Sequence, residues 1–275
     1  MNIQEPRIII PKDINQDELE SYFHSQGLGF LVKTANEGYV PSINEVAIDE
    51  PYRPELLDLY RLHSFIILNK RLTVLEFGSG WSSLVMADAL KKNRHKYIDN
   101  IENLRKANLF ELHAVDNEEH YLNISEERLN KEGFSNYSFL YSKVFMTEYN
   151  GKICTRYKEL PFVNPDFIYL DGPDQFNHIE GTISGLSTAH NDFMPMPMDL
   201  ILIEHFLTPG TIIIADGRTA NVRFLLSNFQ RNWNHQHDYE VDQHILFLDE
   251  EPLGVYNNNQ LEFYNSNDTY QVHKI

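Results

Sequence analysis

The chain has 275 residues, of which 42% are hydrophobic, and this composition is that of a globular protein with a full-sized core rather than a disordered chain. Its formal net charge of −17 repels phosphate backbones and anionic lipids, so we expect neither nucleic acid nor a membrane as partner. Cys154 is the single cysteine, which excludes an internal disulfide and favours a cytoplasmic location.

The first part of the chain is expected to form an accessory or lid segment, residues 1–54, placed before a main domain of residues 55–275. Residues 13–27 predict a short helix that is capped early by Asp or Asn and ends at Gly27. Residues 35–55 contain several glycines and prolines and predict a loop. Residues 54–70 have apolar positions at helical spacing and predict a second helix.

From residue 73 onward, short apolar runs alternate with amphipathic segments. Strands are predicted at 73–77, 111–115, 137–141, 166–170, 211–215 and 244–248. Helices are predicted at 82–92, 118–132, 195–207 and 218–231. This order predicts an α/β fold of the Rossmann-like, doubly wound type, with a mainly parallel sheet covered on both faces.

Two features interrupt this alternation. Residues 143–157 contain Asn150-Gly151 between two β-rich arms, which predicts an inserted β-hairpin. A loop of about twenty residues surrounds 187–198 and has the length of a lid or a substrate loop.

The stretch VLEFGSGWSSLV, residues 74–85, places a glycine turn directly after a buried strand. A phosphate-binding P-loop is excluded, because Trp81-Ser82-Ser83 supplies no lysine after the glycines. A dinucleotide site matches weakly, since the acid that closes the second strand, Asp116, comes forty residues after Glu76. Glu76 would repel a pyrophosphate, whereas it suits a ligand that carries an ammonium and a sulfonium.

At this point the sequence resembles the class I S-adenosylmethionine-dependent methyltransferases. Glu76-Phe77-Gly78-Ser79-Gly80-Trp81-Ser82 resembles motif I of that family, with a serine where a third glycine is common, and 113–122 resembles motif II. Segments 166–176 and 207–218 are similar to the fourth and fifth strands of a small-molecule and sugar O-methyltransferase branch. The resemblance spans roughly residues 55–250 and implies a seven-stranded methyltransferase sheet with an N-terminal helical extension and the hairpin as an insertion.

The resemblance implies S-adenosylmethionine as cofactor and assigns roles to the strand ends. Glu76 would face its methionine end, Gly78 and Gly80 would allow close backbone approach, and Asp116 would accept hydrogen bonds from both ribose hydroxyls. Trp81 or Tyr141 would cover the adenine, unless each packs in the core. The residues implied for cofactor binding are Glu76, Gly78, Ser79, Gly80, Trp81, Ser82, Asp116, Asn117 and Asp171.

On the side of the site that would bind the methyl acceptor, the resemblance implies three catalytic candidates, which are Asp171, His178 and Asp216. Asp171 and Asp216 fall where related enzymes hold a divalent metal such as magnesium. Two ligands make a poor magnesium site unless Asp174 or Glu204 completes it. His178 has the pKa range of a general base, although one of 12 histidines can fall near any site by chance.

Arg218 lies two residues after Asp216 and would pair with it or hold an anionic substrate. The expected reaction is an in-line methyl transfer to the hydroxyl of a small-molecule or sugar acceptor. The alternatives are a binding or scaffold protein without turnover, and a nicotinamide-dependent oxidoreductase. The sequence leaves a homo-oligomer open.

Overall fold

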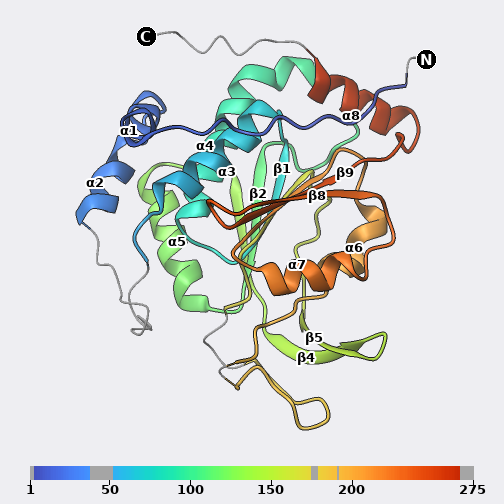
Figure 1. The fold of residues 1–275 in the computed structure, drawn as a ribbon. Helices are drawn as coiled ribbons and strands as arrows, with labels where there is room; N and C mark the ends of the chain where they lie inside the picture. Colours follow the sequence, from blue (N-terminus) through green and yellow to red (C-terminus); the bar gives the residue numbers. More distant parts are fainter. Residues whose placement is uncertain (1–2, 38–51, 175–178, 191, 267–275) are drawn as a thin grey trace.

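The computed structural model describes residues 3–37, 52–174, 179–190 and 192–266. A seven-stranded sheet with the order β3-β2-β1-β6-β7-β9-β8 runs through its centre (Figure 1). These strands are β1 (Thr73–Phe77), β2 (Glu111–Asp116), β3 (Tyr137–Tyr141), β6 (Phe167–Leu170), β7 (Ile212–Asp216), β8 (Trp233–Asp238) and β9 (Gln243–Leu248).

The sheet is parallel from β3 to β7 and antiparallel only at β9 and β8. The strand order turns back at β1, because β2 pairs with one side of β1 and β6 with the other. A sheet of this kind presents the carboxyl ends of its parallel strands along one edge, where ligands bind in doubly wound folds. The expectation of a doubly wound, mainly parallel seven-stranded sheet is therefore confirmed.

Two hydrophobic cores cover the two faces of the sheet, and alternate strand residues contribute to each. Val74 of β1 lies in the first core, with α3 (Leu56–Leu68), α4 (Trp81–Tyr97), α5 (Glu119–Lys131) and α8 (Val255–Asn265). Leu75 and Phe77 lie in the second, with α6 (Asp199–Ile203) and α7 (Thr219–Leu226). The two groups of helices lie on opposite sides of the sheet, with α8 across one end of it (Figure 1).

The N-terminal helices α1 (Gln16–Ser25) and α2 (Gly29–Glu37) add Leu19, Phe23 and Leu31 to the first core. The predicted cap is present, because Asn15 accepts the backbone N–H of Glu18. Helix α1 is therefore attached to the main domain by burial of its apolar face. In the part of the chain that the structure describes, every helix is too short or too polar to cross a membrane.

The predicted hairpin is confirmed as a separate sheet of β4 (Val144–Tyr149) and β5 (Lys152–Tyr157). Its two-residue turn has φ of +49° at Asn150 and +73° at Gly151, the backbone that Asn-Gly favours in such turns. Cys154 and Tyr157 of β5 are buried in the second core. The hairpin thus packs beneath the sheet face that carries α6 and α7.

Several element boundaries differ from the prediction. The helix expected at 195–207 is only α6 with the 3₁₀ turn η2 (Glu204–Phe206), because Pro195 and Pro197 stop a helix from beginning earlier. The helix expected at 218–231 ends at Leu226, and β8 follows it. Three further elements, α2, α8 and β8, were absent from the prediction, as was the short η1 (Ile98–Asn100).

Candidate functional site

The turn after β1 packs backbone to backbone against the loop after β6. Gly78 has φ of +101°, a conformation that side chains other than glycine rarely adopt. A Cβ atom on Gly172 would lie 2.6 Å from the backbone nitrogen of Gly78. Phe77 O accepts the backbone N–H groups of Asp171 and Gly172, at 3.0 and 2.5 Å, while Gly78 N donates to Val115 O at 2.8 Å. These contacts fasten the ends of β1, β2 and β6 together.

Glu76 lies inside the molecule, on the face of β1 that α4 covers. Its carboxylate accepts hydrogen bonds from the hydroxyls of Ser82 and Ser83, the latter at 2.6 Å. Burial raises the pKa of Glu76 to about 8, against the lowering effect of these two hydrogen bonds. The contacts of Glu76 therefore hold the first turn of α4, and its approach to a cofactor's methionine end stays a prediction.

Asp116 is the last residue of β2 and is joined to the glycine turn. The hydroxyl of Ser79 donates to its Oδ2 at 2.8 Å, and the backbone N–H of Glu118 donates to its Oδ1 at 3.0 Å. Burial raises the pKa of Asp116 to about 7. Tyr141, which pairs with Asp116 in register at the end of β3, is 45% exposed. The structure thus places an acceptor carboxylate and an accessible aromatic ring side by side at this strand edge.

Asp171 directly follows β6, and its half-exposed side chain lies beside Arg218. Arg218 Nε is 3.9 Å from Asp171 Oδ1, and Arg218 Nη2 donates to the backbone carbonyls of Asp171 and Pro173, the latter at 2.8 Å. Arg218 therefore contacts the loop after β6, and among the described residues its ion pair is with Asp171 and not with Asp216 as expected. Buried Nη1 of Arg218 has no hydrogen-bond partner among the described residues.

Asp216 ends β7 and faces a carboxylate that the sequence analysis missed. Burial raises the pKa of Asp216 to about 7, with further contributions from Asp58 and Asp171, while the Tyr169 hydroxyl donates to its Oδ2 at 3.3 Å. Burial and the charge of nearby Glu55 raise the pKa of Asp58, on α3, to about 6. The one sequence signal of Asp58 is that it is the single acidic residue of α3, in the first turn of that helix.

Trp81 and Asn117 make contacts that fix the surrounding loops. Trp81 Nε1 donates to the backbone carbonyl of Tyr52 at 3.0 Å, and the guanidinium of Arg128 lies 3.7 Å from the centre of the indole ring. The indole also packs against the first core, so its contacts favour packing over the adenine role. Asn117 Oδ1 accepts the backbone N–H of Asp174 at 2.9 Å, which ties the loop after β2 to the loop after β6.

The magnesium site implied by Asp171 and Asp216 does not fit the side chains present. Among the described residues, no third His, Cys, Asp or Glu lies with these two at metal-binding distance. Glu204 is buried at the opposite end of β7, where its carboxylate accepts the Trp233 indole N–H and two backbone N–H groups. Magnesium requires about six oxygen ligands in near-octahedral geometry, so we derive no chemistry from this ion.

His178, the candidate base, lies outside the residues that the structure describes. Within those residues, the group that does satisfy metal-ligand proximity is His237, Asp242 and His244, at the start of β9 and the end of β8. Sequence analysis missed it because β8 was not predicted. The signal was present as histidines two residues apart, with a third following a short turn.

The chain is similar to solved structures of other proteins, whereas comparisons of its sequence find no match. No protein-family model and no curated protein matches the chain. Among solved structures, it is similar to the O-methyltransferase from Bacillus cereus in complex with SAH, at 12% identity and a TM-score of 0.40, covering 88% of this chain and 93% of that one.

Two further similar structures belong to other organisms. The O-methyltransferase TomG from Streptomyces achromogenes, in complex with SAM, has 12% identity and a TM-score of 0.40, with 88% and 92% coverage. The SAH-bound methyltransferase PaMTH1 from Podospora anserina has 12% identity and a TM-score of 0.43, with 87% and 98% coverage. These values are too low to carry a functional inference, which we therefore argue from the site.

Proposed function

We propose that the chain is an S-adenosylmethionine-dependent methyltransferase. The observation that carries this proposal is the hydrogen bond from Ser79 to Asp116, which couples the glycine turn after β1 to the acid that ends β2. A carboxylate at this strand edge has only acceptor atoms and can take both hydroxyls of a ribose. Asp116 is already oriented by Ser79 and by the backbone N–H of Glu118, so it would bind a nucleoside without rearranging.

The strand order favours this cofactor over a nicotinamide dinucleotide. The dinucleotide-binding fold has six strands in the order 3-2-1-4-5-6, with two similar parallel halves. In this chain the second half is interrupted, because β9 enters antiparallel between β7 and β8. Gly78 and Gly80 also lack the third glycine of the dinucleotide motif, since Ser83 stands at that position.

The packing around Gly80 supports a cofactor at the glycine turn. A Cβ atom on Gly80 would contact nothing nearer than Ser82 Oγ at 3.8 Å, an ordinary van der Waals distance. The bound cofactor would supply a methyl group activated by its sulfonium. The backbone of residues 78–80 would fix the depth of the cofactor in the site, and Asp116 would fix its ribose.

We propose the hydroxyl of a small molecule or sugar as methyl acceptor. Asp171 directly follows β6 and lies beside the Arg218 guanidinium, and Asp216 ends the neighbouring strand β7. The pKa of about 7 at Asp216 suits a group that takes a proton from a hydroxyl near neutral pH. Orientation of the acceptor by these residues would supply the larger part of the lowering of the activation barrier, about 7–11 kcal/mol for well-aligned reactants. His178 remains the other candidate base.

The proposal is tested by calorimetric titration with S-adenosylmethionine and S-adenosylhomocysteine. We expect one saturable site in the wild-type protein and loss of binding in Asp116→Asn. The matched control is Asp99→Asn, an exposed carboxylate in η1, which should bind as the wild type does. Wild-type protein that binds NAD but neither sulfur nucleoside would make the chain a nicotinamide enzyme. Binding without methyl transfer to any acceptor would favour a scaffold protein.

A further inference from the structure

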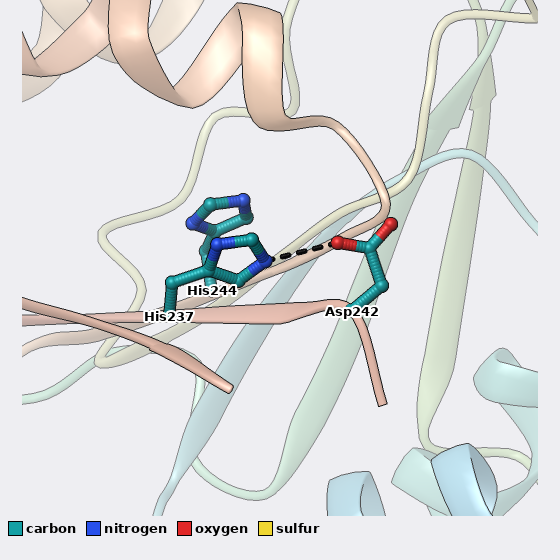
Figure 2. Close-up of side chains that lie close together, drawn as sticks. All are labelled: His237, Asp242 and His244. Carbon is teal, nitrogen blue, oxygen red and sulfur yellow. Dashed lines mark hydrogen bonds and ion pairs between the residues drawn. The ribbon is translucent and has the colours of Figure 1, made fainter. Parts of the chain in front are cut away.

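Histidines and a carboxylate gather where β8 turns into β9. His237 and His244 are paired across the two strands, and their rings stack with centroids 3.8 Å apart. Asp242 lies two residues before His244, and its Oδ1 is 2.9 Å from His237 Nε2 (Figure 2). The candidate ligand atoms of these three residues all lie within 4.8 Å of one another.

A fourth donor extends the cluster. His235 lies on the same strand face as His237, because the two are two residues apart in β8. Its Nε2 is 2.9 Å from His244 Nδ1, and the two rings stack with centroids 5.2 Å apart. A third imidazole therefore adjoins the cluster through its contact with His244.

The mixture of nitrogen and oxygen donors selects the kind of ion. Imidazole is a ligand of zinc and neighbouring transition metals, whereas magnesium and calcium take oxygen ligands. Zinc–nitrogen bonds of about 2.0–2.1 Å in a tetrahedron require donor atoms about 3.3 Å apart. His237 Nε2 and Asp242 Oδ1 are 2.9 Å apart, close to that separation, and the His244 donor atom lies within 4.8 Å of both, so a bound ion would draw the three side chains together.

The surroundings support the cluster as a site. Thr219, in the first turn of α7, lies 2.9 Å from His244 Nε2 and would fix the orientation of that buried ring. Asp242 is 62% exposed at its side chain, which leaves a path for an ion from solvent. The positive charge of Arg223 on α7 acts on His244 and would oppose a bound cation, but the Arg223 side chain is exposed to solvent.

We propose that His237, Asp242 and His244 bind a divalent transition-metal ion of the zinc type, with His235 as the fourth ligand. The backbone carbonyl of Asp242 accepts the N–H of Gly217 at 2.9 Å, and Gly217 directly follows Asp216. The ion would therefore hold the β8–β9 turn against the end of β7. This inference rests on the geometry of the hairpin and is independent of the methyltransferase proposal.

The test is titration of the metal-free full-length protein with Co²⁺ followed by Zn²⁺. We expect one equivalent of Co²⁺ to give the visible absorption of a four-coordinate site with nitrogen ligands, and Zn²⁺ to displace it. His237→Gln and Asp242→Asn should each weaken the affinity by about 10- to 100-fold, and the double variant should abolish the absorption. Zn²⁺ should raise the Tm of the wild type because it binds the folded state.

The matched control is His190→Gln, which removes an exposed imidazole beside a single carboxylate, Asp192, in the loop before α6. This variant should bind Co²⁺ as the wild type does. The circular dichroism of each variant confirms that it is folded. Equal Co²⁺ affinity in the wild type and the double variant, or no binding to the wild type, would overturn the proposal.

Discussion

The hydroxyl of Ser79 donates a hydrogen bond of 2.8 Å to Oδ2 of Asp116, and this contact joins the turn after β1 to the end of β2 across 37 residues of sequence. It orients a buried carboxylate that also accepts hydrogen bonds from backbone N–H groups, among them that of Glu118. Loss of the Ser79 hydroxyl should leave the backbone of Asp116 in place, while the carboxylate becomes free to turn away from the ribose. The contact therefore contributes to affinity more than to folding.

We accordingly expect Ser79→Ala to weaken S-adenosylhomocysteine binding by roughly tenfold or more, the range for a hydrogen bond to a charged group. The measurement is the Kd by calorimetry, with the Tm recorded alongside. The control is Ser227→Ala, whose exposed hydroxyl donates to the Phe224 carbonyl at the end of α7. An unchanged Kd in Ser79→Ala would show that the hydrogen bond from Ser79 to Asp116 does not contribute to cofactor binding.

Cofactor binding should depend on pH through Asp116. Burial raises its pKa to about 7, so at pH 6 much of the group is protonated and cannot accept both ribose hydroxyls. Binding of a cationic nucleoside should then release a proton and become tighter as pH rises from 6 to 8. Calorimetry in two buffers of different ionisation enthalpy measures this release directly. An affinity that stays constant over this range would contradict the assignment.

Glu76 should make the protein less stable as the pH rises. Its pKa is about 8 in the folded protein against an ordinary value of 4.5, so the folded state binds more protons than the unfolded state between these limits. Its favourable contribution is full below pH 4.5 and is lost as the pH rises through 8. The Glu76→Gln variant buries no charge. At pH 9 its free energy of unfolding should therefore be higher than that of the wild type by on the order of a few kcal/mol.

Urea unfolding of the wild type and Glu76→Gln at pH 5 and pH 9 provides the comparison. At pH 5 the two free energies of unfolding should be nearly equal, because the wild-type carboxyl is then protonated. Some dependence on pH should remain in the variant, since Asp199 and Asp216 also have a raised pKa. A Glu76→Gln protein that is less stable than the wild type at pH 9 would show that the ionised group is stabilised.

Two glycine variants should separate folding from binding. A Cβ atom at Gly172 would lie 2.6 Å from Gly78 N and 2.7 Å from the Tyr157 hydroxyl, so Gly172→Ala should lower stability by about 1–3 kcal/mol. A Cβ atom at Gly80 would meet only Ser82 Oγ, at an ordinary contact distance of 3.8 Å. Gly80→Ala should therefore keep the wild-type Tm and still lose cofactor affinity. Thermal unfolding and calorimetry on the same samples test both, and equal stability of the two variants would contradict the packing.

Magnesium should have no effect on this protein. Asp171 and Asp216 lack a third His, Cys, Asp or Glu ligand among the described residues, and Arg218 already places a positive charge beside Asp171. We expect neither saturable heat on titration with Mg²⁺ nor any change in Tm or in S-adenosylhomocysteine affinity. Tight Mg²⁺ binding that is lost in Asp171→Asn would show that the implied metal site exists.

The sequence predicted the central strands well because each is a continuous apolar run between turn signals. It missed β8, whose residues Trp233–Asp238 are largely polar, since an edge strand with one exposed face carries little hydrophobic signal. Helix α8 was missed for a related reason: its Asn-rich sequence has low helix propensity, and the helix is held by burial of Leu261 and Phe263.

The residues of the candidate site that lie at the carboxyl ends of strands were predictable from the sequence. Asp116 and Asp216 close β2 and β7, and Asp171 directly follows β6. Contacts between distant segments were not predictable, because sequence patterns do not specify which side chains meet. The contact of Arg218 with the β6 loop and the effect of Asp58, on α3, on the pKa of Asp216 are of this kind. The His237 cluster required knowledge of how β8 and β9 pair.

The most direct test of the account is a crystal structure of the protein with S-adenosylhomocysteine. The account predicts that both ribose hydroxyls donate to Asp116 and that the backbone of Gly78 and Gly80 lines the homocysteine part. The Ser79 to Asp116 hydrogen bond should persist in that complex. A nucleoside bound away from Asp116, or a site that stays empty at saturating ligand, would contradict the central claim.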